Sequence, residues 1–344
     1  MKKHKLLVIF LIVFSVSLIS FVFYAYQTVK TPNVLVEQPD KVMLIPTGAD
    51  FKQVQNILYD EGYVNDLVSF SMLAKLMKYD ENVKPGRYQL QANMSNQEAI
   101  RLLRSGNQTP VNITFNNIRL KNELAQRLCE NLEADAATLE KMLNDEEVVA
   151  KYGFTTENIL TMFLPNTYQF FWTTTEQELL ERMHREYEKF WTVERRKKAD
   201  SLKMSPVEIS ILASIVESET NKADEAPKVA GLYLNRLQRN IALQADPTLV
   251  FAAQDFTIKR VLNKHKEIDS PYNTYKYTGL PPGPIRIPSP NSLNAVLNYQ
   301  DHNYLYMCAK EDFSGYHNFA TNLRTHLANA QRYQRALSNA GIYN

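Results

Sequence analysis

An uncharged and strongly apolar run from Leu6 to Thr28 constrains this chain more than any other feature of its sequence. Three lysines lie within the first five residues, and Lys30 ends the run. A helix needs about 20 mostly apolar residues to cross the hydrocarbon core of a bilayer. Because this run is long enough, residues 1–28 are expected to form a short cytoplasmic tip and a transmembrane anchor.

The charges around the apolar run predict its orientation. Lysines that precede a first span usually stay in the cytoplasm, so the rest of the chain is expected outside it. Tyr24 and Tyr26 would then lie at the outer interface. A cleaved signal peptide is the alternative, but the apolar region is too long and no A-x-A-like site follows. No cysteine lies near the end of the run, which excludes a lipoprotein.

Bulk composition predicts a folded chain with no nucleic-acid partner. A length of 344 residues allows two or three domains. Hydrophobic residues make up 44% and charged residues 22%, and the net charge of +2 gives no basic footprint for nucleic acid. Cys129 and Cys308 lie far apart without metal-binding or redox spacing. We expect two core residues, with a disulfide as the alternative.

The region after the anchor divides into a linker and a small module. Residues 29–40 carry two prolines and little pattern, which is typical of a linker. Residues 41–110 then alternate strand and helix patterns, which predicts a small α+β module. The expected elements are a strand at 41–46, helices that begin after Asp50, at Leu67 and at Asn96, and a strand at 85–90.

Helical patterns dominate the rest of the chain. After a short strand at 111–115, residues 111–200 predict a mainly helical linking region. The aromatic segment FLPNTYQFFW (163–172) interrupts it. Residues 201–344 form the last predicted domain, and the fold class is therefore α+β overall.

One helix in the last domain carries a candidate catalytic carboxylate. Ser205 and Pro206 give a helix start signal. In the following sequence, Glu219 lies at helical spacing from Leu212, Ile215 and Val216, so it prolongs an apolar stripe. Glu217 points about 200° away around the helix axis.

A carboxyl group on an apolar stripe has two interpretations. Loss of solvent raises its pKa, which keeps it protonated near neutral pH, and a glycosidase acid needs that state. Alternatively, Glu219 forms a structural ion pair with Arg236 or Lys228.

Two later segments add candidate substrate contacts. Residues 270–288 are rich in proline and cannot form a helix, so we expect an ordered loop that exposes Tyr272, Asn273 and Tyr275. Rings and amides are what a sugar cleft needs, although a purely structural loop is the alternative. Asp246, which precedes Pro247, is interpreted as a helix cap, with a strand expected at 304–310.

The segment GYHNFATNLRTH (315–326) holds His317, Asn322 and His326. A zinc site would need a third ligand at recognisable spacing, which the segment lacks. We therefore expect His317 and Asn322 to line the cleft, with no metal and no cofactor.

Several segments together resemble the endolytic murein transglycosylases, the YceG-like family. Module 41–110 is similar to the family's LysM-like subdomain, and FLPNTYQF to its aromatic Pro-x-Thr segment. This chain departs from the family pattern at Asn166, where aspartate is usual, and at ILTM (159–162), where Glu-Gly is common. The matching segments are ASIVESET (213–220), KVAGLYLNRL (228–237), LQADPT (243–248), YNTYKYTGLPPGPI (272–285), YLY (304–306) and HNFATNLRTH (317–326).

The resemblance implies a lytic transglycosylase with a lysozyme-like, mainly helical catalytic domain. It would cleave the MurNAc–GlcNAc bond within peptidoglycan strands, leave 1,6-anhydroMurNAc ends and terminate nascent glycan elongation. The family's catalytic glutamate corresponds to Glu219, although Glu217-Ser218 also matches a broader transglycosylase pattern. The predicted substrate-binding residues are Asn273, Tyr275, Tyr272, Gln244, Asn322 and His317.

The resemblance also implies a location and partners. The protein would be a single-pass protein of the cytoplasmic (inner) membrane with its catalytic part in the periplasm. Its partners would be glycan strands and the peptidoglycan synthases of division or elongation. Two alternatives stay open, namely a hydrolytic muramidase with Asp246 as the second carboxylate, and a non-enzymatic peptidoglycan-binding scaffold.

Overall fold

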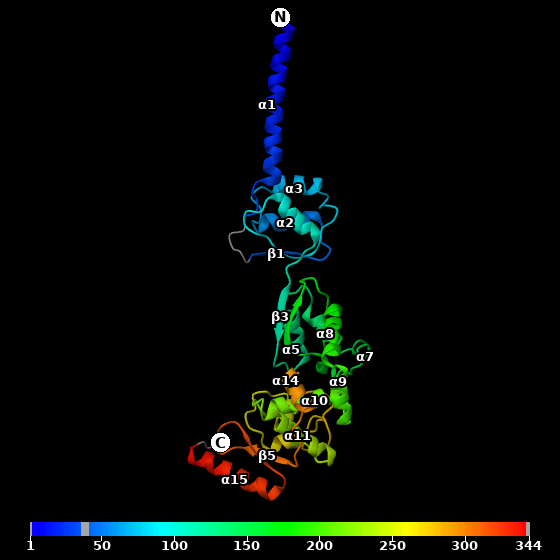
Figure 1. Cartoon of the computed structure of the whole chain (residues 1–344), viewed down its shortest axis with the longest axis vertical. Coiled ribbons are helices and arrows are strands. Elements are labelled where there is room, and N and C mark those ends of the chain that lie inside the picture. Colours follow the sequence, from blue (N-terminus) through cyan, green and yellow to red (C-terminus); the bar gives the residue numbers. More distant parts are fainter. Residues whose placement is uncertain (1, 36–40, 342–344) are drawn as a thin grey trace. The chain divides into compact units, whose positions relative to one another are not determined.

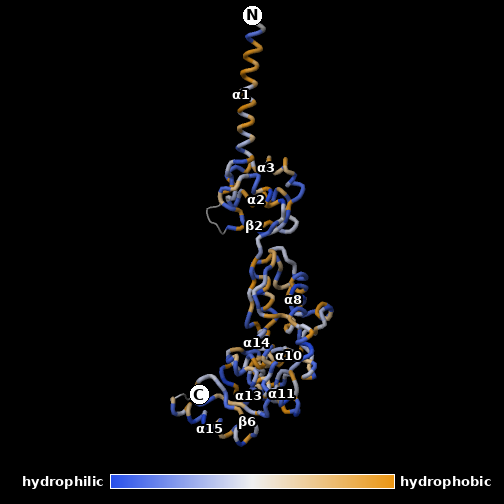
Figure 2. Tube along the Cα trace, viewed as in Figure 1, coloured by the Kyte–Doolittle hydropathy of each residue, from blue (hydrophilic) through white to orange (hydrophobic). Residues whose placement is uncertain are grey.

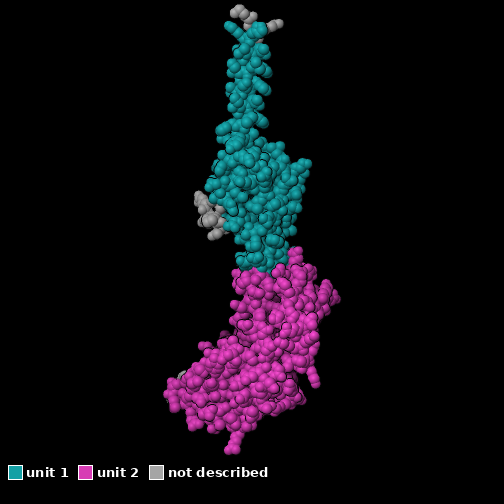
Figure 3. All heavy atoms as spheres, viewed as in Figure 1, with its two compact units in different colours: residues 1–112, 131–134, 169–175 teal, residues 113–130, 135–168, 176–344 magenta. Residues whose placement is uncertain are grey.

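The chain divides into two compact units, which are described separately (Figure 3). The computed structural model describes residues 2–35 and 41–341. Helices and two-stranded sheets alternate through it, which confirms the α+β class (Figure 1). The likeness of its parts to LysM and lysozyme domains stays a prediction. Unit 1 comprises residues 1–112, 131–134 and 169–175, and unit 2 comprises residues 113–130, 135–168 and 176–344.

The apolar run forms the first helix, α1 (Lys2–Lys30). Its side chains are exposed along the apolar stretch, and α1 is mostly orange in Figure 2. Within the described residues it is the one helix that is long and apolar enough to cross a membrane. The predicted single membrane-spanning segment therefore has a matching helix.

The helices of unit 1 begin and end at local capping residues, at the positions that the sequence predicts. Asp50 caps α2 and forms a reciprocal capping box with Gln53. Ser95 and Glu98 do the same for α4, which ends at Gly106 in the left-handed conformation. The remaining elements also match their expected positions. After α1 the unit contains β1 (Val42–Ile45), α2 (Phe51–Asp60), α3 (Leu67–Leu76), β2 (Gly86–Gln89) and α4 (Asn96–Ser105).

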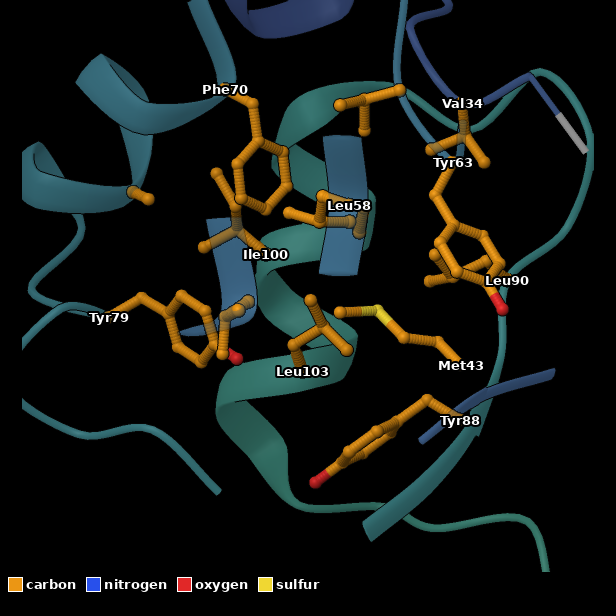
Figure 4. Close-up of a cluster of buried hydrophobic side chains, with 14 of the residues drawn as sticks. Val34, Met43, Leu58, Tyr63, Phe70, Tyr79, Tyr88, Leu90, Ile100 and Leu103 are labelled. Carbon is orange, nitrogen blue, oxygen red and sulfur yellow. The ribbon is translucent and has the colours of Figure 1, made fainter. Parts of the chain in front are cut away.

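The core of unit 1 lies between its helices and a small sheet. β1 and β2 pair antiparallel, with Val42 opposite Gln89 and Ile45 opposite Gly86. Side chains from all five elements after α1 meet there, and those of Leu58, Phe70 and Ile100 are fully buried (Figure 4).

The described part of the expected linker packs onto this core. Val34 is 2% exposed and forms an isolated bridge with Val64. The side-chain Nδ2 of Asn33 donates to Asn96 Oδ1 (2.6 Å), and the side-chain Nδ2 of Asn96 donates to the Thr28 carbonyl (2.9 Å). This buried polar network ties the end of α1 to the module, so residues 31–35 are part of the unit. Residues 36–40 lie outside the described part of the chain.

Unit 2 is mainly helical and contains the small sheet of β5 and β6, whereas strands β3 and β4 each have residues in both units. The aromatic segment contains a strand, β4, that pairs with β3. β5 and β6 form an antiparallel hairpin in which Ala309 lies opposite His317. The elements are β3 (Val111–Phe115), α5 (Lys121–Cys129), α6 (Ala136–Leu143), α7 (Glu146–Ala150), η1 (Ile159–Met162), β4 (Asn166–Phe170), α8 (Glu176–Phe190), α9 (Val193–Ser201), α10 (Pro206–Glu219), α11 (Ala226–Gln238), α12 (Asp246–Ala253), α13 (Asn263–Lys266), α14 (Pro290–Leu297), β5 (Tyr306–Ala309), β6 (His317–Ala320) and α15 (Leu323–Asn339).

Helix α10 is the centre of unit 2. It begins at the predicted Ser205 cap, which forms a capping box with Glu208, and packs against α11, α12 and α14. Every residue from Ile209 to Val216 is buried. The helix is thus buried on all sides, whereas the sequence predicted one apolar stripe. Ser210 and Ser214 fit there because their hydroxyls donate to backbone carbonyls of the same helix.

Both cysteines are free thiols. Cys129 is buried, as expected for a core residue, and Cys308 is partly buried. Burial raises the pKa of both thiols, to about 11 for Cys129. The alternative of a disulfide between them is therefore wrong for this structure.

The Asn33–Asn96 network gives a test of how firmly the end of α1 is attached. Asn96→Ala would leave the Thr28 carbonyl and the Asn33 amide without their buried partner, at a cost of about 1–3 kcal/mol. We expect a lower Tm for the full chain in detergent, measured by differential scanning fluorimetry. The exposed Lys52→Ala on α2 serves as the control and should leave Tm unchanged. Equal Tm values for the two variants would contradict a stabilising network.

Candidate active site

Glu219 is the last residue of α10. The buried helix fixes its backbone, and Thr220 follows in extended conformation. The residue keeps partial access to solvent, although its carboxyl group is densely surrounded by protein atoms. A rigid helix end thus presents one carboxyl group to a cavity.

The surroundings of Glu219 favour its neutral form. Burial, with a smaller contribution from the nearby charge of Asp246, raises its pKa from the ordinary 4.5 to about 7. The Tyr233 hydroxyl, which donates to Glu219 Oε1 at 2.7 Å, and His317 act in the opposite direction. The C-terminal end of a helix also disfavours an anion. The carboxyl group is therefore poised to exchange a proton near neutral pH.

No cation pairs with Glu219 among residues 2–35 and 41–341, so the structural ion pair considered from the sequence is absent there. The guanidinium of Arg236 instead donates to the carbonyls of Leu305 (2.6 Å), Ala242 (2.9 Å) and Leu243 (3.0 Å). Lys228 lies over the rings of Tyr304 and Phe319. Arg236 is only 6% exposed, and its bonds hold the chain before α12 and β5 against α11.

Asp246 lies beside Glu219 and does not cap its helix. It is the first residue of α12, and no side-chain hydrogen bond caps that helix. Its Oδ1 instead accepts a hydrogen bond from the Tyr275 hydroxyl at 2.5 Å. Tyr275 comes from the proline-rich loop, so this contact brings the loop to the site. The sequence interpretation of Asp246 as a cap is therefore wrong.

His317 is held next to Glu219 by a buried carboxylate. Glu225, 5% exposed, accepts from the His317 backbone amide (2.8 Å) and lies 2.9 Å from its Nδ1. The Thr220 hydroxyl donates to the same carboxylate at 3.1 Å. Glu225 thus connects the end of α10 to β6 and fixes the position of His317.

Two hollows meet at Glu219 and Asp246, which line both of them. The wide cleft has a volume of about 900 Å³, with basic residues on its walls beside the rings of Phe251 and Phe256. The inner pocket measures about 270 Å³ and includes Tyr233. The basic residues of the wide cleft are Arg119, Lys259, Arg260 and Arg286.

The structure gathers three of the predicted substrate-binding residues at the inner pocket, namely Gln244, Tyr275 and His317. Tyr272 instead contacts Phe251, with the two rings tilted by 49°, and lines a third hollow, which Glu157 also lines. It is not among the residues that line the two hollows at Glu219 and Asp246.

Asn273 and Asn322, both predicted to contact substrate, are not among the residues that line the two hollows. Asn273 is fully buried, and its amide binds the backbone of residues 266, 268, 275 and 276. It shapes the loop, as the structural alternative predicts. Asn322 caps α15 by accepting from the Thr325 amide. Both side chains form hydrogen bonds to the backbone in this structure.

Glu217 has a separate environment from Glu219. Its Oε2 accepts from the Ser289 amide at 2.6 Å, and its Oε1 lies 3.4 Å from the Arg286 guanidinium. These contacts fix the segment before α14 and leave Glu217 with structural partners.

Sequence reasoning missed Tyr233 and Glu225 as parts of the site, and it considered Arg236 only as an ion-pair partner of Glu219. Tyr233 and Arg236 are three residues apart and so share one face of α11, which was a usable signal. Glu225 lies in a short connection without periodicity. Its role depends on β6, which is distant in sequence.

Comparisons with known proteins agree with these motifs. The YceG-like family model matches residues 43–332. A crystal structure of a YceG-like protein from Listeria monocytogenes superposes with a TM-score of 0.56 at 26% identity, covering 84% of this chain and 98% of that one.

Two curated relatives carry the name endolytic murein transglycosylase. The one from Streptococcus pneumoniae is 28% identical over 338 residues, and the match covers 89% of this chain but only 61% of the relative's length. The one from Bacillus subtilis is 40% identical over 131 residues, which is 38% of this chain and 36% of that one. Because the family model spans the module, the linking region and the helix that carries Glu219, the chain belongs to the YceG-like family.

Proposed function

We propose that this protein is a membrane-anchored lytic transglycosylase that cuts peptidoglycan glycan strands within their length. The observation that carries the proposal is the Glu219 carboxyl group, which has a pKa of about 7 and lies where two hollows meet. A strand that occupies both hollows would place one glycosidic bond beside a proton donor. The names of the curated relatives support this reaction class.

In the proposed reaction, neutral Glu219 gives its proton to the oxygen of the MurNAc–GlcNAc bond as that bond breaks. The resulting carboxylate takes the proton of the muramoyl 6-hydroxyl, whose oxygen attacks the anomeric carbon. A 1,6-anhydro ring closes, and Glu219 ends protonated as it began. The sugar supplies its own nucleophile, so the cycle needs no second carboxylate and no water.

Neighbouring groups prepare Glu219 for both steps. Tyr233 donates to Oε1, which leaves Oε2 for the proton that is transferred. The charge of Asp246 would stabilise positive charge that develops on the sugar ring. His317 lowers the pKa of Glu219 and so offsets part of its rise, which stabilises the carboxylate that remains after proton transfer. Gln244 and Tyr275 line the inner pocket and are proposed to contact the sugar.

A hydrolytic muramidase is the second candidate, and Asp246 is the observation that favours it. Most glycoside hydrolases use two carboxyl groups that flank the bond to be cleaved. Asp246 would then act on a water molecule or on the anomeric carbon, with Glu219 as the acid.

The proposed setting is the outer side of the cytoplasmic membrane. The N-terminal lysines favour retention of the tip in the cytoplasm, which would place both units in the periplasmic space. There the enzyme would end the elongation of nascent glycans beside the peptidoglycan synthases. A non-enzymatic scaffold would need neither the raised pKa of Glu219 nor the two hollows.

The first prediction separates the two glutamates of the catalytic helix. Glu219→Gln removes the proton donor and should lower turnover of purified glycan strands by roughly 10²-fold or more. Glu217→Gln is the matched control on the same helix. It should lower Tm, because it weakens contacts to Ser289 and Arg286, while most activity remains. Full activity in Glu219→Gln would refute the assignment.

A second prediction concerns pH. The folded-state pKa of Glu219 lies above its unfolded value. Between about pH 4.5 and 7, Glu219 is therefore protonated in the folded protein but ionised in the unfolded chain. Stability relative to Glu219→Gln should therefore fall by about 3 kcal/mol across that window and level off above it. Denaturant titrations of both proteins at several pH values measure the difference. A constant difference would mean that the pKa is ordinary. Turnover should also decline above about pH 7.

Product chemistry distinguishes the two candidate enzymes. Digests in heavy-oxygen water should incorporate no label at new muramoyl ends, and mass spectrometry should find those ends lighter by one water than hydrolysis products. Labelled reducing ends would establish the muramidase, with Asp246→Asn then expected to abolish turnover. Unchanged strands after incubation with the folded wild-type protein would favour the scaffold.

A further inference from the structure

Helix α3 exposes a line of apolar side chains. Val68 is 75% exposed, Met72 42% and Leu76 74%. Their spacing of four residues places them on one face over about 12 Å of helix. The opposite face buries Phe70 and Leu73 in the core. The helix is therefore apolar on both faces, which is unusual for a helix that water surrounds.

Helix α3 lies beside the end of α1 that follows the apolar run. α3 and α4 both contact α1, and α3 lies beside the base of α1 in Figures 1 and 2. Thr28 is already 5% exposed because the module covers it, only two residues and about 3 Å beyond Tyr26. The polar interfacial zone of a bilayer is about 5–7 Å thick on each side. With α1 as the membrane span and Tyr26 at its outer interface, as the sequence predicts, the module would begin inside that zone.

Positive charges border the apolar line. Lys75 and Lys78 are exposed at the C-terminal end of α3, and Lys30 is exposed at the end of α1. Apolar side chains flanked by lysines are typical of helices that lie in the surface of an anionic membrane. The contact with α1 and these charges identify one occupant for the exposed face, namely lipid.

We propose that the outer face of α3 lies in the interfacial layer of the leaflet from which α1 emerges. Val68, Met72 and Leu76 enter the boundary between headgroups and acyl chains, while the lysines contact anionic headgroups. The module is then held to the membrane at two places, α1 and α3, which fixes its orientation. The proposal requires α1 to span the membrane and is independent of the glycan chemistry.

Fluorescent labels at single cysteines test this placement in the full chain. The background carries Cys129→Ala and Cys308→Ala, and an environment-sensitive dye is attached to Met72→Cys or Leu76→Cys. Each protein is placed as a single copy in nanodiscs of phosphatidylcholine and phosphatidylglycerol, with or without nitroxide-labelled lipid. The matched control is Leu44→Cys, an exposed apolar position on β1 of the same unit. Phe14→Cys in α1 reports on the anchor.

We expect nitroxide lipid to quench the labels at positions 72 and 76 several-fold more than the label at 44, with blue-shifted emission. Two positions are used so that one poorly folded variant, detected by its Tm, leaves the other as a readout. Quenching no greater than at position 44 would overturn the proposal. Blue-shifted emission without lipid quenching would also overturn it, because protein would then cover the face. An unquenched label at position 14 would overturn it together with the anchor.

Discussion

The chemistry of this protein depends on the burial of one carboxyl group at the end of a buried helix. Residues 209–216 of α10 are surrounded by other helices, so the helix cannot shift without disturbing the core of unit 2. Its last residue therefore has a fixed position, and its environment is set by packing. Desolvation is the main cause of the raised pKa of Glu219, and Asp246 adds to it. The proton affinity that the proposed reaction requires is thus a consequence of how the core is built.

Each neighbour of Glu219 is itself positioned by a partner outside the cleft. Tyr233 lies on α11, which packs against α10. Tyr275 reaches Asp246 because Asn273 holds the proline-rich loop from inside. His317 is held by Glu225, which also binds Thr220 directly after α10. Helix α11, the proline-rich loop and β6 therefore meet around Glu219 and Asp246, and Asn273, which shapes the loop, is not among the residues that line the two hollows.

The sequence predicted those features that depend on neighbouring residues. Capping boxes at Asp50 and Ser205 and the left-handed Gly106 are local signals, and the helices begin or end there as expected. Features that depend on long-range contacts were missed. Asp246 before Pro247 matches a cap signal, yet its carboxylate instead accepts a hydrogen bond from Tyr275, which is distant in sequence. Asn273 and Asn322 were polar and near motifs, but polarity alone does not distinguish a ligand contact from a backbone contact.

The pairing of Arg236 shows why Glu219 is available for proton transfer. A buried arginine next to a buried carboxylate normally forms an ion pair, which lowers the pKa of the acid. Here three backbone carbonyls and Gln244 use the guanidinium donors. The positive charge is satisfied by neutral acceptors, and the Glu219 carboxyl group receives a hydrogen bond from neutral Tyr233 instead. The same arginine also holds the chain that leads into α12, which carries Asp246. One residue thus places the second carboxylate in the cleft without neutralising the first.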